Sequence, residues 1–157
     1  MSNRNDSRDE PSKAVPFTIT IKVRDNCLCL HSQRAARAIA RKFDEAFRPL
    51  DLKSGQFSIL MSLNRPEPPT LGAVADLLGM DRTTLTANLK PLERRGLLAV
   101  FPDAKDRRLR RLSLTDAGRD ILFDAVPLWE WTQAELEKAL GIDGEPDRLR
   151  SNLNALA

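Results

Sequence analysis

The sequence predicts a mainly α-helical protein with a small β-wing, arranged as a winged helix-turn-helix between N- and C-terminal helices. Three observations predict this fold class. A glycine separates a short apolar helix from a second, capped helix, and two short strands with a charged connection follow directly. The segment 82–111 also carries 9 basic and 3 acidic side chains, in a chain whose net charge is only +3. Such a local excess favours a surface that binds a polyanion, with a merely solvated surface as the alternative.

The composition excludes several classes of protein. The 157 residues suffice for one compact domain, and no apolar run reaches the roughly 18 residues of a membrane-spanning helix. The polar segment 1–16 lacks the apolar centre of a signal peptide. Two cysteines and one histidine are too few for a common zinc site or a catalytic triad. We therefore expect a cytoplasmic protein that is not an enzyme and uses no metal or cofactor.

Residues 1–24 are expected to form a flexible tail or arm, followed by a single domain over 25–157. In the arm, Phe17 to Val23 alternate apolar and polar residues, the period of two that is typical of a strand. Asp25 is a suitable cap for a helix over about 25–50, because apolar residues then recur at helical spacing. The apolar positions of this helix include Leu28, Ile39 and Phe43.

The DNA-binding lobe is expected over about residues 54–114. Ser54 can cap its first helix, which a proline-rich break ends at Pro66. A short helix over 71–78 follows and ends at Gly79, because glycine adopts the left-handed conformation of a sharp turn at little cost.

The next helix is capped by Asp81, ends at Gly96, and is expected to bend at Pro91. It buries a stripe of leucines and exposes hydroxyls, methyls and cations, which are the groups that read bases and bind phosphates. The predicted DNA contacts of this helix are Arg82, Thr83, Thr84, Thr86, Ala87 and Lys90.

Two strands are predicted at 97–101 and 109–114, and the charged connection PDAKDRR between them has the length of a hairpin tip. Thr115 can cap a long helix that runs to about Leu140, and a last short helix carries three leucines. The segment 116–157 is therefore expected to be helical.

This order of elements, together with the pattern DxRxxxxxLT formed by Asp106, Arg108, Leu114 and Thr115, resembles the MarR family of winged-helix regulators. The resemblance runs from about residue 25 to residue 140. It implies that Arg108 enters the minor groove of DNA, where negative potential is concentrated, and that Asp106 holds its guanidinium. The neighbouring cations Lys105, Arg107, Arg110 and Arg111 would add phosphate contacts, with merely solvated charge as the alternative.

The resemblance further implies a homodimer, because the family packs its N- and C-terminal helices across a two-fold axis. Residues 25–50 and 116–157 would form this interface, and the dimer would bind a pseudo-palindromic operator. We expect a repressor that a small effector releases from DNA, and the candidate effectors are an aromatic compound and an oxidant. Phe43 and Trp129 are the candidate residues for its pocket, with core or interface packing as the alternative.

A second interpretation is a thiol-based sensor of peroxides. The segment NCLCL resembles the start of the first helix in the organic-hydroperoxide-sensing OhrR branch, whose reactive cysteine matches Cys29. The positions of that branch's sulfur-binding tyrosines hold Gln33 and Phe43, and the chain contains no tyrosine. Cys27, near the helix start, is the second candidate for redox sensing, and the alternative for both cysteines is that they are small buried residues at the dimer interface. The two would face about 200° apart on one helix, which disfavours a bond between them.

Two interpretations from other classes remain open. A winged helix can serve as a protein-interaction module, and Cys29 with His31 could form a nucleophilic site. The same facing-apart argument disfavours the enzyme.

Overall fold

The computed structural model describes residues 14–141 and 145–156, and it divides the chain into two compact units between Ala36 and Arg37. The boundary predicted from the sequence, between a flexible arm and a single domain, lies earlier in the chain, after residue 24. No helix within the described ranges combines the length and the apolarity needed to cross a membrane.

The first unit is helical, so the expectation of an extended arm at Phe17 to Val23 is wrong. This segment lies in α1 (Phe17–Asn26), which α2 (Leu28–Ala46) follows. A lone segment without a partner strand satisfies its backbone hydrogen bonds within itself only as a helix, which explains the difference. Residues 1–13 of the expected tail lie outside the described residues.

The predicted helix over 25–50 is also corrected. Asp25 lies in the last turn of α1 rather than at a cap, and Cys27 interrupts the helix with extended backbone (φ −76°, ψ 108°). α2 then ends at Ala46, and a 3₁₀ turn, η1 (Arg48–Leu50), accommodates Pro49.

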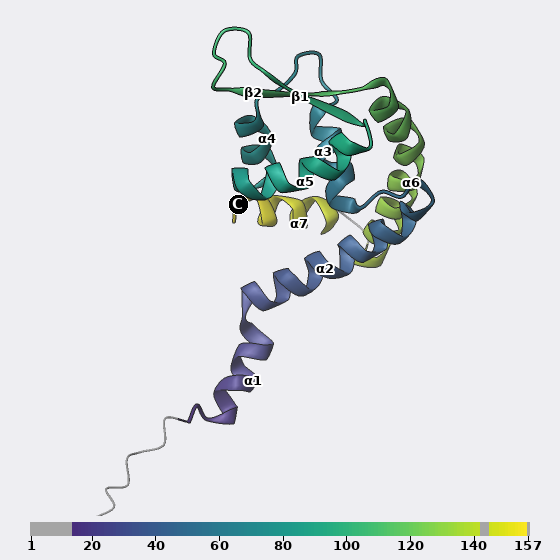
Figure 1. Cartoon of the computed structure of the whole chain (residues 1–157). Helices are drawn as coiled ribbons and strands as arrows, with labels where there is room; N and C mark the ends of the chain where they lie inside the picture. The colour runs from purple at the N-terminus through teal and green to yellow at the C-terminus, as the bar shows by residue number, and fades with distance from the viewer. Residues whose placement is uncertain (1–13, 142–144, 157) are drawn as a thin grey trace, which may run out of the picture. The chain divides into compact units, whose positions relative to one another are not determined.

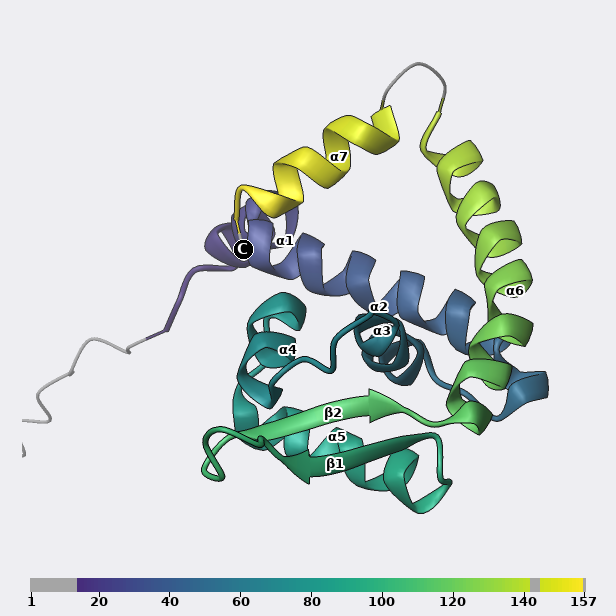
Figure 2. The same ribbon diagram turned by 90° about the horizontal axis from the view of Figure 1, so that it is seen from above.

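The second unit contains the winged helix-turn-helix in the predicted order (Figures 1 and 2). β1 and β2 form one antiparallel hairpin in which Leu98 lies opposite Leu114 and Pro102 lies opposite Arg110. The hairpin projects beyond the helices that surround it (Figure 2). After the end of α2, the elements are η1, α3 (Ser54–Leu63), α4 (Leu71–Leu78), α5 (Arg82–Arg94), β1 (Leu98–Pro102), β2 (Arg110–Leu114), α6 (Asp116–Leu140) and α7 (Glu145–Asn154).

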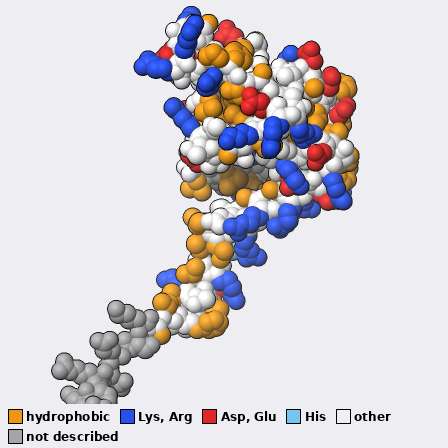
Figure 3. Space-filling view, in the orientation of Figure 1, with side chains coloured by type: hydrophobic (Ala, Val, Ile, Leu, Met, Phe, Trp, Pro, Cys, Tyr) orange, Lys and Arg blue, Asp and Glu red, His pale blue; other side chains and the backbone are white. Residues whose placement is uncertain are grey.

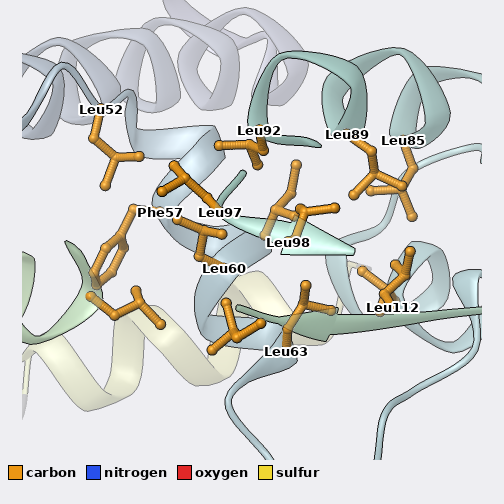
Figure 4. Close-up of a cluster of buried hydrophobic side chains, with 14 of the residues drawn as sticks. Leu52, Phe57, Leu60, Leu63, Leu85, Leu89, Leu92, Leu97, Leu98 and Leu112 are labelled. Carbon is orange, nitrogen blue, oxygen red and sulfur yellow. The ribbon is translucent and has the colours of Figure 1, made fainter. Parts of the chain in front are cut away.

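One hydrophobic core holds α3, α4, α5, α6 and the hairpin together, and α3 lies at its centre (Figure 4). The predicted stripe of α5 is confirmed, because Leu85, Leu89 and Leu92 are all buried. Burial of each such side chain contributes about 1.5–3 kcal/mol, so the core fixes the exposed face of α5 as well. Other core residues are Phe47, Leu52, Phe57, Ile59, Leu60, Leu63, Val74, Leu98, Leu112, Leu114, Leu122 and Ala125.

The start of α3 is capped from another helix, which corrects the expected role of Ser54. Ser54 is the first residue of α3, and its backbone N–H donates to Asp44 Oδ1 of α2 at 2.7 Å. This hydrogen bond favours the charged carboxylate and lowers the pKa of Asp44. Asp44 thus ties the end of α2 to the central helix.

We expect Asp44→Ala to lower the free energy of unfolding by about 0.5–2 kcal/mol, because it leaves a helix-terminal N–H without its acceptor. Urea denaturation at pH 7 measures the change. The depressed pKa means that the carboxylate stabilises the fold above its unfolded pKa of about 4, and that this contribution is lost as the pH falls below it. A difference between Asp44→Ala and wild type that did not shrink towards pH 3 would contradict this role.

The hairpin is fastened to the start of α6 by a close backbone approach. Thr115 caps α6 as predicted: its Oγ1 accepts from the Gly118 N–H at 3.0 Å and donates to Gly96 O at 2.6 Å. The Thr115 N–H donates to Leu97 O at 3.2 Å. Gly118 lies so near this carbonyl that an added Cβ would be 1.9 Å from Leu97 O.

Candidate DNA-binding surface

The turn of the helix-turn-helix is built as the sequence predicts. Gly79 ends α4 in the left-handed region (φ 61°), which favours glycine. Asp81 caps α5, since its Oδ1 accepts from the Thr84 N–H at 2.8 Å and its Oδ2 accepts from Thr84 Oγ1 at 2.6 Å. These bonds from Thr84 lower the pKa of Asp81, because they favour the charged carboxylate. The cap fixes where α5 starts and which side chains it presents.

α5 continues through Pro91, where Arg95 N–H donates to Pro91 O at 3.1 Å, so the proline does not end the helix. The side chains of α5 outside the buried leucine stripe form an exposed face. All the predicted contact residues of this helix lie on that face. They are Arg82, Thr83, Thr84, Thr86, Ala87 and Lys90.

The threonine hydroxyls on this face differ in what they can still bind. Thr84 donates its hydroxyl hydrogen to Asp81, and Thr86 donates to Arg82 O at 2.7 Å. Both residues therefore present a methyl group and acceptor lone pairs outward. The Thr83 hydroxyl has no partner among the residues that the structure describes. Methyl contacts to thymine thus fit Thr84 and Thr86 better than donated hydrogen bonds do.

The tip of the wing carries a bidentate ion pair. Arg108 Nε and Nη2 donate to Asp106 Oδ1 and Oδ2, both at 3.1 Å, and the Arg108 backbone N–H donates to Oδ1 at 3.0 Å. The Arg108 side chain is 90% exposed, so the pair holds a cation in solvent at a defined place. The guanidinium is also the main cause of the lowered pKa of Asp106.

Arg111 does not join the exposed cations of the wing, which corrects the expectation of a phosphate contact. Its Nε donates to Asp103 Oδ2, and its Nη1 donates to Pro68 O at 2.6 Å. Asp103 is buried, and Arg111 together with two backbone N–H groups lowers the pKa of Asp103 to about 2. Asp103 is not among the residues predicted from the sequence, although an aspartate directly after Pro102 in a polar connection is a turn signal.

The helix-turn-helix and the wing meet at a shallow recess with three arginines. The Arg82 guanidinium covers the first turn of α4, where a Cβ added to Gly72 would lie 3.1 Å from Arg82 Nη2. Arg108 and Arg110 contribute the wing side of the recess. In the space-filling view, Lys and Arg side chains lie over the wing and over α5 (Figure 3). Part of the sequence excess of positive charge, namely Arg82, Arg108 and Arg110, thus gathers at this recess between α5 and the wing.

An open groove of about 550 Å³ lies elsewhere in this unit, between the C-terminal half of α2 and α6. Neither candidate pocket residue lines it. Phe43 packs against the core and stacks on Phe47, with ring centroids 5.8 Å apart, and Trp129 lies outside the groove. Trp131 is the aromatic residue of the groove, which is also lined by Ala38, Arg41, Lys42, Glu45, Ala46, Thr132, Glu135 and Leu136.

The cysteines lie in the first unit and do not share a regular helix. Cys27 occupies the break between α1 and α2, so the angular argument against a bond to Cys29 does not apply. Cys29 is exposed, and Gln33 Nε2 donates to its sulfur at 3.1 Å. The His31 ring contacts the Asp25 carbonyl (Nε2 to O, 3.3 Å).

Comparison with known proteins gives the family context. A model of the MarR family matches residues 52–109. The chain is 38% identical to the Mycobacterium tuberculosis transcriptional regulator MosR in complex with DNA, with a TM-score of 0.75, over 83% of this chain and 96% of that one.

Two curated relatives match over shorter stretches. They are the Bacillus subtilis regulator YybA, an HTH-type transcriptional regulator (28% identical over 55% of this chain), and the Rhodopseudomonas palustris transcriptional activatory protein BadR (31% over 61%). The matched part spans 57% of the length of each of these two relatives.

Proposed function

The chain belongs to the MarR family, and from this premise we propose that it is a homodimeric, sequence-specific DNA-binding transcriptional regulator. We propose further that it represses its target and that a small-molecule ligand releases it from DNA. One observation carries the proposal: Arg82 of the capped helix α5 and Arg108 and Arg110 of the wing line the same recess. The solved complex of a 38% identical regulator with DNA supports the same assignment.

On this proposal, α5 lies in the major groove with its exposed face against the base edges, and Arg108 enters the adjacent minor groove. The recess between them suits a backbone phosphate, because Arg82 and Arg110 line it beside the arginine that enters the minor groove. Asp106 reduces the number of conformations that Arg108 loses on binding, since it already holds the guanidinium.

A second copy would cover apolar side chains that the terminal helices leave exposed. In the first unit, Phe17 and Leu28 are exposed, and in the second unit Leu153 of α7 and Leu156 just after it are exposed. Large exposed apolar side chains of this kind are typical of interfaces. A dimer also offers two recognition helices, which adds the contact area that a specific operator requires.

The proposal is tested by measuring the affinity of the protein for the DNA upstream of its own gene, in competition with unrelated duplex. We expect preferential binding by a dimer, which light scattering identifies. Transcription of a reporter should fall when the protein is present, whereas a rise would show an activator. Equal affinity for all duplexes would contradict sequence-specific regulation and favour a protein-interaction module.

Substitutions on the exposed face of α5 are expected to have two different effects on DNA binding. Thr84→Ala and Thr86→Ala should change the preference among operator variants, because they remove methyl groups that touch bases. Lys90→Ala should weaken all sequences equally and lower the slope of log affinity against log salt by about one, since a phosphate contact carries no base information. Thr86→Val, which keeps a methyl at this position, is the matched control. If Lys90→Ala changed the sequence preference instead, the proposed placement of α5 in the groove would be wrong.

For the ligand, the groove between α2 and α6 is the better candidate than the Phe43 and Trp129 site. It combines the indole of Trp131 with the cations of Arg41 and Lys42, which suits a planar aromatic acid. Titration of aromatic acids should quench tryptophan fluorescence and release DNA in parallel. Trp131→Leu should abolish both responses, and the retention of both in this variant would exclude the groove.

A second candidate is sensing of organic hydroperoxides, which the exposure of Cys29 favours. The sulfur would attack the terminal peroxide oxygen, the O–O bond would break, and an alcohol would leave as Cys29 becomes a sulfenic acid. The thiol is oxidised by two electrons and the peroxide is reduced. Peroxide should then release DNA from the wild type but not from Cys29→Ser. Unchanged DNA binding after treatment would leave the small-molecule ligand as the release signal.

A further inference from the structure

We propose that Asp103 and Arg111 are positioning residues for Arg108, which hold the wing tip at a fixed place relative to the helix-turn-helix without contacting DNA themselves. This inference rests on the proposed function, because it explains how Arg108 is presented to the minor groove.

The buried side chain of Asp103 holds the backbone of the wing tip in place through hydrogen bonds. Its side chain is 7% exposed, and its Oδ1 accepts from the backbone N–H groups of Lys105 at 2.7 Å and Asp106 at 2.9 Å. Its own backbone N–H donates to Leu109 O at 3.0 Å, which closes the tip. Asp106 is thereby fixed, and it is Asp106 that binds Arg108. The carboxylate of Asp103 therefore acts on Arg108 through one intermediate residue.

Arg111 connects this tip to the segment that leads into α4. Its guanidinium pairs with Asp103 and also donates to Pro68 O at 2.6 Å. One residue further along β2, the Leu112 N–H donates to Pro69 O at 3.0 Å. Thr70, which caps α4, forms a β-bridge with Arg111. The Arg111 side chain and these two backbone contacts thus join the wing to the entrance of the helix-turn-helix.

This arrangement fits positioning better than stabilisation. A partly buried ion pair gains little net stability, because desolvation offsets its Coulomb attraction. A long cation on a free loop, in contrast, loses side-chain and loop freedom when it binds, and pre-ordering removes this cost beforehand. The three neighbouring arginines of the wing, Arg107, Arg108 and Arg110, are exposed, and only Arg111 turns inward.

The test is a double-mutant cycle on DNA affinity, with a labelled duplex that the wild-type protein selects from a random-sequence pool. We expect Asp103→Ala to weaken binding about two- to tenfold at fixed salt. In the Arg108→Ala background the same substitution should change the affinity by less than twofold, because the residue that it positions is gone. The control is Asp116→Ala, which breaks an exposed ion pair with Arg119 on α6 and should leave the affinity unchanged.

Equal losses in both backgrounds would overturn the proposal, since Asp103 would then act independently of Arg108. An unchanged affinity in Asp103→Ala would overturn it as well. If Asp103→Ala does not fold, Asp103→Asn takes its place in the same cycle, because asparagine keeps an acceptor for the two N–H groups and loses only the charge facing Arg111. If Arg108→Ala itself binds normally, the proposed role of the wing fails, and the positioning role fails with it.

Discussion

Replacing Arg108 with alanine is expected to weaken operator binding by about 1–3 kcal/mol and to leave the fold intact. The side chain is 90% exposed and its guanidinium pairs with Asp106 at the surface, so its loss removes nothing from the core. When the protein binds DNA, however, the Arg108 side chain would lie in the minor groove, which is narrow and has a strongly negative potential. Fluorescence anisotropy at several salt concentrations measures both the affinity and the salt slope, which should fall by about one.

Arg107→Ala is the matched control for this variant, because Arg107 is an exposed neighbour without the carboxylate partner that Arg108 has. Arg107→Ala should lower the affinity for DNA less than Arg108→Ala does at every salt concentration. Asp106→Asn should also cost less, since it loosens the arginine without deleting it. Full affinity of Arg108→Ala at fixed salt would remove the wing from the binding mechanism.

Replacing Gly118 with alanine is expected to destabilise the protein by about 3 kcal/mol, although alanine is the better helix former. The added Cβ would lie 1.9 Å from Leu97 O, a backbone atom that cannot rotate away. The start of α6 would have to shift, and the hydrogen bonds that Thr115 makes to Gly96 and Leu97 would be strained or lost. Chemical denaturation gives the free energy of unfolding directly.

Gly55→Ala provides the comparison, because Gly55 is also helical and a Cβ there would meet nothing within 4 Å. It should stabilise the protein by up to about 1 kcal/mol through the reduced freedom of the unfolded chain. Similar stabilities of the two variants would mean that the hairpin and α6 are less closely packed than the structure shows.

The second unit could be predicted closely because its signals are local. Gly79, Asp81, Gly96 and Thr115 mark turns and caps by their own chemistry, and the leucine stripe of α5 follows from helical spacing. Each of these features depends on residues within a few positions of one another. Their agreement along the chain is what made the order of elements readable.

The errors arose where distant residues decide the structure. Asp44 caps α3 across ten residues, and Arg111 turns inward because Asp103 and Pro68 lie beside it in space. Neither partner can be chosen from spacing alone. The period of two in α1 was misleading for a related reason, since a strand requires a partner strand that no sequence pattern supplied.

The continuity of α6 has a thermodynamic consequence. Its 25 residues span about 37 Å, with the Thr115 and Gly118 junction to the hairpin at one end and the groove around Trp131 in the other half. A tilt of the helix at one end would therefore reach the other end through Pro127, which lies between them. If a ligand in the groove lowers the affinity for DNA by some factor, bound DNA must lower the affinity for the ligand by the same factor. The concentration of effector required for induction would therefore depend on how many operator copies the cell contains.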